Sequence, residues 1–122
     1  EGVATLEDGL YVLEENLKNA AFKDKMVRFV RASMKGWKYA EQNPAEAAEI
    51  VVDNDDSGAQ TVEHNTTQMG EIIKLTAGSN GALDPADYQR TVDSLMTGGS
   101  DPVITKMPEG AWTHEITDLA LK

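Results

Sequence analysis

The stretch FKDKMVRFVRASMKGWKYAEQNPAEAAEIVVDN, from Phe22 to Asn54, decides the fold. Its first half predicts one long amphipathic helix, because one set of residues recurs at steps of three and four and shares one side of a 3.6-residue helix. This mostly apolar set is Met26, Phe29, Val30, Ser33, Met34 and Trp37. The remaining surface is basic, which is typical of a solvated helix face, and carries Lys23, Lys25, Arg28, Arg31, Lys35 and Lys38.

A sharp corner at Asn43-Pro44 separates this helix from a second one. The residue before a proline is pushed out of the helical region, so the long helix is expected to end here. Asn43 is a favourable N-cap, Pro44 suits the first helical position, and Glu46 stands three residues later as a capping-box partner. The sequence therefore predicts that a new helix begins directly at the corner.

A third helix is predicted from about Gly58 to Thr76, with Ser57 and Gln60 as its capping box. It follows the polar segment that begins at Asp53, and Gly78 is placed to end it in a left-handed C-cap.

Two more helices are predicted towards the C-terminus. The first begins at Asp84-Pro85, an N-cap followed by a first-turn proline, and stops at Gly98-Gly99. The last is short and runs from its cap, Thr113, through Leu121.

The best strand candidate, Gly9–Leu13, precedes all of these helices. It is a short apolar run of β-formers bounded by acidic residues. Such a run is usually covered on both faces of a sheet, yet the chain offers no second convincing strand to pair with it. The predicted fold class is therefore mainly α, with four to five helices and one or two short strands.

Composition excludes several classes of function. The chain has 122 residues and a net charge of −10, which argues against binding nucleic acid or an anionic membrane surface. It has no cysteine, so disulfides, thiolate metal sites and cysteine nucleophiles are excluded. No apolar run approaches the roughly 20 residues of a membrane span. Because the chain begins at Glu1 without a methionine, we expect it to be processed or truncated.

The run Asp53-x-Asp55-x-Ser57-Gly58 matches the first half of an EF-hand calcium loop. The loop needs a bidentate glutamate at its twelfth position, where this chain has His64; Glu63 falls one residue short and points about 100° away on a helix. We interpret the run as a polar turn whose Ser57 caps the next helix.

No catalytic or metal-binding constellation is predicted. His64 and His114 are far apart, lack partners at ligand spacing, and are interpreted as surface histidines. Phe29 and Trp37 are interpreted as core residues of the long helix. Tyr11 differs, because an aromatic ring with a polar tip near the acidic pair Glu7-Asp8 suits recognition of a small cationic or heteroaromatic ligand.

The order of strand, long helix, Asn-Pro corner and helix, from Gly9 to Val51, resembles the return segment of ABC-transporter substrate-binding proteins. These are type II periplasmic binding proteins, and the likeness is to the branch that binds taurine and other sulfonates, nitrate and pyrimidine precursors of thiamine. Two family patterns carry it, "F-x-x-A-x-x-x-G-W-x-Y-A" and "N-P-x-E-A-A-E-I". They match Phe29, Ala32, Gly36, Trp37, Tyr39 and Ala40, and then Asn43, Pro44, Glu46, Ala47, Ala48, Glu49 and Ile50. The runs GALDPADYQRTVDSLMTGG and PEGAWTHEITDLAL are also similar to the tail of such proteins.

The resemblance implies that residues 1–122 are a single C-terminal segment of a longer, two-lobed α/β protein. Residues 1–13 would form the crossover strand between the lobes, and residues 22–122 the helical portion. The strand would then pair with strands that this chain does not contain.

The resemblance also implies the solute-binding component of an ABC importer, periplasmic or extracellular and associated with the membrane through the transporter. Lobe closure would enclose a sulfonate, nitrate or pyrimidine-like solute for delivery to the ABC permease, without a cofactor or covalent chemistry. Position near the crossover makes Glu7, Asp8 and Tyr11 the expected ligand-binding residues. An exposed strand edge would favour a homodimer or strand exchange of the segment.

Two alternatives remain open. One is an acidic helical protein-interaction module. The other is a thiamine pyrimidine biosynthesis enzyme of the same fold, whose chemistry depends on histidine and cysteine; with no cysteine and two scattered histidines, this chain is expected not to be an enzyme.

Overall fold

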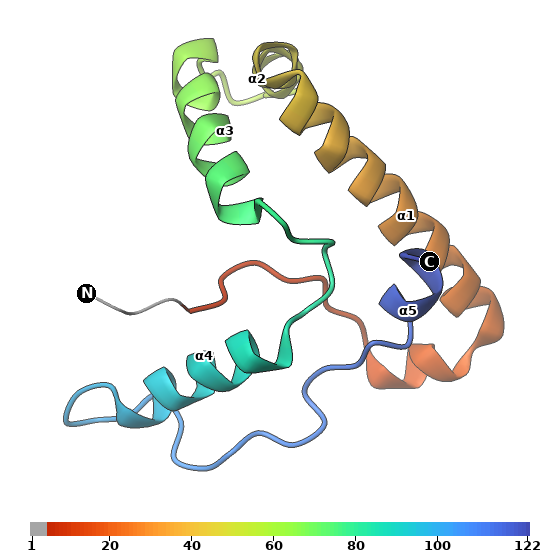
Figure 1. Cartoon of the computed structure of the whole chain (residues 1–122), viewed down its shortest axis with the longest axis vertical. Coiled ribbons are helices and arrows are strands. Elements are labelled where there is room, and N and C mark those ends of the chain that lie inside the picture. The colour runs from red at the N-terminus through yellow and green to blue at the C-terminus, as the bar shows by residue number, and fades with distance from the viewer. Residues whose placement is uncertain (1–4) are drawn as a thin grey trace. The chain divides into compact units, whose positions relative to one another are not determined.

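A computed structural model describes residues 5–122, which are mainly helical, and the predicted fold class is confirmed in that respect. The elements in chain order are η1 (Glu14–Lys18), α1 (Ala20–Gln42), α2 (Pro44–Asp53), α3 (Val62–Thr76), α4 (Pro85–Thr97) and α5 (Thr117–Ala120) (Figure 1).

The strand predicted over Gly9–Leu13 is absent, because residues 5–13 have no regular secondary structure. A β-strand is stabilised by hydrogen bonds to a neighbouring strand. The described part of the chain contains no strand that Gly9–Leu13 could pair with. Residues 1–4 of the predicted crossover segment lie outside the described residues.

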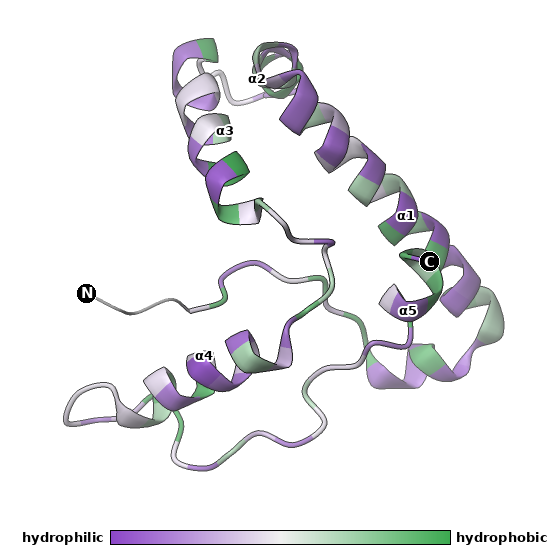
Figure 2. Ribbon diagram, in the orientation of Figure 1, coloured by the Kyte–Doolittle hydropathy of each residue, from purple (hydrophilic) through white to green (hydrophobic). Residues whose placement is uncertain are grey.

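The long helix α1 has a cap that the sequence analysis missed. The Asn19 side-chain oxygen accepts hydrogen bonds from the backbone N–H groups of Ala21 and Phe22, at 2.9 and 3.1 Å. These bonds satisfy two of the donors that a helix N-terminus leaves open. Figure 2 shows polar and apolar residues interleaved along α1, in keeping with its amphipathic pattern.

The corner between α1 and α2 lies where it was predicted, but the capping box is wrong. The Asn43 side-chain amide donates backwards to the carbonyl of Tyr39 at 3.0 Å, and this carbonyl also accepts from the Asn43 backbone N–H at 2.9 Å. Glu46 instead accepts a hydrogen bond from the Tyr39 hydroxyl, which raises the pKa of that phenol. The side chains at the corner therefore tie the end of α1 to the start of α2.

The start of α3 also differs from the prediction. Thr61, not Ser57, is the N-cap, and its hydroxyl accepts from the backbone N–H of His64 at 3.2 Å. Ser57 is instead engaged by Asp55, which holds the preceding turn. The helix therefore begins at Val62, four residues later than Gly58.

The start of α4 is confirmed, since the Asp84 carboxylate accepts from the N–H of Ala86 at 2.7 Å and Pro85 follows the cap. The predicted cap of the last helix is wrong, because the Thr113 hydroxyl accepts from the N–H of Glu115 at 3.2 Å in the turn ahead of the helix, which begins only at Thr117. The α-helix there, α5, is shorter than predicted.

The described chain divides into two compact units, and each is described by itself. Apart from the last two residues, one unit contains residues 28–81 and the other contains residues 5–27 and 82–120. In the second unit, the N–H of Leu6 donates to the Thr91 hydroxyl of α4 at 2.8 Å. Lys23 near the start of α1 pairs with Glu115.

The core of the unit 28–81 lies where α2 packs on α3. Ala48 is fully buried there, with an exposed fraction of 0%, and Ala47 beside it is also buried. In the same unit, the Met34 side chain occupies the space that a Cβ would fill at Gly81, whose φ of +87° also favours glycine.

Candidate functional site

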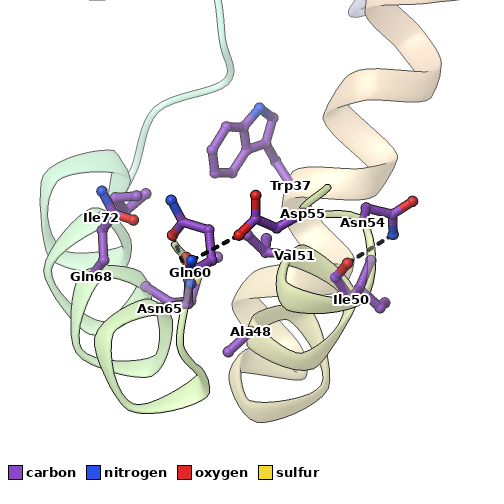
Figure 3. Close-up of a pocket in the computed structure, with 11 residues that line it drawn as sticks. Trp37, Ala48, Ile50, Val51, Asn54, Asp55, Gln60, Asn65, Gln68 and Ile72 are labelled. Atoms are coloured by element: carbon purple, nitrogen blue, oxygen red, sulfur yellow. Dashed lines mark hydrogen bonds between the residues drawn. The ribbon is translucent and has the colours of Figure 1, made fainter. Parts of the chain in front are cut away.

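The unit 28–81 contains an open groove of about 640 Å³ (Figure 3). It is bordered by α2 and α3 and by the segment that joins them, with one residue from α1. The lining residues are Trp37, Ala48, Ile50, Val51, Asn54, Asp55, Gln60, Asn65, Gln68, Met69 and Ile72. Most of them are apolar or carry neutral amides, so the groove is suited to a small molecule with an apolar body.

Trp37 places its indole ring on this groove, above Asp55 and Gln60 in Figure 3. The interpretation of Phe29 and Trp37 as core residues is wrong, because their exposed fractions are 52% and 49%. Helical spacing puts both on the apolar side of α1, but spacing cannot say whether another element covers that side.

Asp55 is held by a small network of hydrogen bonds. One carboxylate oxygen accepts from the N–H and the hydroxyl of Ser57, at 2.9 and 2.5 Å, and the other accepts from the N–H of Gln60 at 2.7 Å. The hydrogen bond from the Ser57 hydroxyl, followed by those from the backbone, holds the pKa of Asp55 below its ordinary value. The groove therefore contains a carboxylate that is ionised at neutral pH.

Acidification is expected to loosen the 55–60 turn. Because the pKa of Asp55 in the folded chain lies below its ordinary value of 3.8, its stabilising effect is complete above that value. The effect is lost as the pH falls through the folded-state pKa. NMR titration should show the amide signals of Ser57 and Gln60 moving together with a midpoint below 3.8. Asp55→Asn should remove that transition; a midpoint at or above the ordinary value contradicts the network.

Asn65 connects the same turn to α3. Its side chain has an exposed fraction of 6%, and its amide nitrogen donates to the Gln60 side-chain oxygen and to the Thr61 carbonyl, both at 3.0 Å. Both N–H groups of the amide are therefore used. Asn65 and Asp55 hold Gln60 from two sides, so the turn and the first turn of α3 form one hydrogen-bonded structure (Figure 3).

The residues predicted to bind ligand lie in a different part of the chain. Glu7, Asp8 and Tyr11 are all exposed in the irregular segment before η1. The Tyr11 ring folds back against the backbone of Gly9, and its exposed fraction is 83%. None of the three lines the groove described above, and their role stays a prediction.

The two histidines have different surroundings. His64 is exposed on the first turn of α3, whereas His114 is half-buried, which corrects its interpretation as a surface residue. The His114 ring lies 4.8 Å from that of Trp112, and its Nε2 is 2.8 Å from the carbonyl oxygen of Leu83. Neither histidine belongs to a group of three or more potential metal ligands within residues 5–122.

No helix in the described part of the chain has the length and apolarity needed to cross a membrane. No protein-family model, curated protein or solved structure matches the chain.

Proposed function

We propose that the chain is the C-terminal part of a two-lobed α/β solute-binding protein of an ABC importer. The observation that carries the proposal is the apolar run Gly9–Leu13, which is exposed and precedes η1 and the helix pair joined at Asn43-Pro44. Leu10 and Leu13 in this run have exposed fractions of 58% and 65%. A run of β-formers of this kind gains its stability by joining a sheet, and the two helices after it carry the residues that resemble the family.

In this proposal, residues 1–13 cross between the lobes and complete a sheet supplied by the rest of the protein. A sulfonate, nitrate or pyrimidine-like solute binds between the lobes, and a hinge motion encloses it before delivery to the membrane permease. Glu7, Asp8 and Tyr11 contribute contacts near the crossover. The protein acts in the periplasm or outside the cell, and the bound solute undergoes no covalent change.

The test is a thermal-shift screen of the natural protein that contains this chain, against taurine, nitrate, pyrimidines and amines. A solute at 100 times its Kd should raise the Tm by about 5–10 °C, since binding then adds about 2.7 kcal/mol to the unfolding free energy. Tyr11→Ala should weaken the binding of that solute about tenfold. Tyr88→Ala in α4 is the control and should leave the Kd of the solute unchanged. A full screen without any shift counts against the proposal.

An acidic helical interaction module is the second candidate, favoured by exposed apolar side chains along the described chain, among them Leu6, Val62 and Val103. Light scattering and a thermal melt of the 122-residue chain separate the two functions. A monodisperse monomer with a cooperative melt favours the module. A homodimer or larger species, formed through the exposed 6–13 segment, favours the importer component.

A further inference from the structure

The groove between α2 and α3 combines one carboxylate, one exposed indole ring and an apolar wall. We propose that it is a binding site for a small organic cation with an apolar or aromatic body, such as an arylalkylammonium ion. The site lies within the unit 28–81, does not include Glu7, Asp8 or Tyr11, and does not depend on the proposed function.

Charge decides the class of ligand. Asp55 carries the one formal charge among the described residues that line the groove, and no lysine, arginine or histidine lines it. An anion such as a sulfonate or nitrate would meet a carboxylate without a compensating cation. A neutral apolar ligand would desolvate that carboxylate without replacing its water. A cation supplies the positive charge that would balance Asp55 in the groove.

Asp55 is held by several hydrogen bonds from one turn. The N–H and hydroxyl of Ser57 and the N–H of Gln60 donate to it, and the N–H of Ala59 interacts with the same carboxylate. These same bonds fix the carboxylate in place before a ligand arrives, which reduces the ordering that binding requires. The negative charge of a carboxylate that is already oriented can therefore attract an ammonium group in the groove.

The aromatic and apolar residues complete the site. The half-exposed Trp37 ring offers a π face that attracts a cation, and Val51, Met69 and Ile72 offer a surface for an apolar body. The basic residues of α1 do not compete, because helical spacing puts Arg28, Arg31, Lys35 and Lys38 on a stripe away from Trp37.

Three probes that share one aromatic ring test the charge requirement. Benzylammonium, benzyl alcohol and benzoate are titrated into the full chain at low salt and neutral pH, and NMR shifts of the groove amides give each Kd. Benzylammonium should bind with a Kd of about 1 mM, and benzyl alcohol at least about fivefold more weakly. Benzoate should not bind. Equal affinity for all three, or no binding of benzylammonium, overturns the proposal.

A matched pair of variants on α3 tests the location. Gln68→Lys puts a positive charge into the groove and should weaken the binding of benzylammonium about tenfold. Thr66→Lys adds the same charge to an exposed position outside the groove and should change the Kd less than about twofold. Neither change touches the hydrogen bonds of Asp55. Trp37→Leu should cost about fivefold in affinity. Equal effects of the two lysine variants place the cation elsewhere and contradict the proposal.

Discussion

Replacing Ala48 by aspartate is expected to unfold the α2–α3 pair. Ala48 is fully buried where the two helices pack, so a carboxylate there would be removed from water, and among the described residues no lysine, arginine or histidine lines the groove that Ala48 borders. An unpaired buried charge costs several kcal/mol, and a domain has about 5–15 kcal/mol of stability in total. We therefore expect Ala48→Asp to lower the unfolding free energy by at least about 3 kcal/mol.

The control for this change is Ala45→Asp in the same helix. Ala45 is exposed in the first turn of α2, where a negative charge interacts favourably with the helix dipole. This variant should be neutral or more stable by a few tenths of a kcal/mol. Urea unfolding followed by circular dichroism, with hydrogen exchange of α2 and α3, compares the two. If both variants lose the same stability, the α2–α3 packing described above is wrong.

Local chemistry explains what could be predicted from the sequence. The Asn43-Pro44 corner and the Asp84-Pro85 start of α4 each depend on two adjacent residues whose backbone preferences leave little choice. The structure places helix boundaries at both. The helical character of α1 was also predictable, because its 3.6-residue pattern extends over too many residues to be read as a strand.

Choices between neighbouring polar residues could not be predicted in the same way. Ser57 and Thr61 are both suitable N-caps, and the structure uses Thr61 because Asp55 has already engaged Ser57. The Asn43 side chain could accept a hydrogen bond from an N–H of α2 or donate one to a carbonyl of α1, and it donates to the carbonyl of Tyr39. Sequence patterns list the available donors and acceptors, whereas the outcome depends on which of them lie within bonding distance.

The groove itself gave no sequence signal. In the sequence, Asp55 belongs to a run that matches part of a calcium loop, and Trp37 is interpreted as a core aromatic residue. Neither interpretation predicts that the two residues line the same groove. Trp37 lies on α1 and Asp55 in the turn after α2, so all of α2 separates them in sequence, and they line one space only in the folded unit. The exposure of Trp37 and the absence of a strand at Gly9–Leu13 were not predicted, for a related reason: both depend on what lies across from these residues, and residue spacing does not show that.

Asn65→Asp is expected to be the most destabilising single-atom change in the groove. The Asn65 amide nitrogen donates to two oxygens, and a carboxylate oxygen in its place would face both without a hydrogen to share. Two hydrogen bonds lost at a buried side chain cost about 3 kcal/mol, which exceeds the gain of at most about 1 kcal/mol from a negative charge near the start of α3. The turn at 55–60 and α3 should therefore separate before the rest of the unit unfolds.

The pH dependence distinguishes this explanation from a general loss of packing. Burial against two oxygens raises the pKa of the new carboxyl group in the folded chain, so its penalty is absent below the ordinary aspartate pKa and grows as the pH rises through the folded-state value. The control is Asn54→Asp, the same chemical change at an exposed amide that makes one hydrogen bond, to the Ile50 carbonyl at 2.8 Å. The stability difference between the two variants should be large at neutral pH and small near pH ~3, because the protonated acid regains one donor. A difference that stays constant with pH contradicts the assignment of both donors to Asn65.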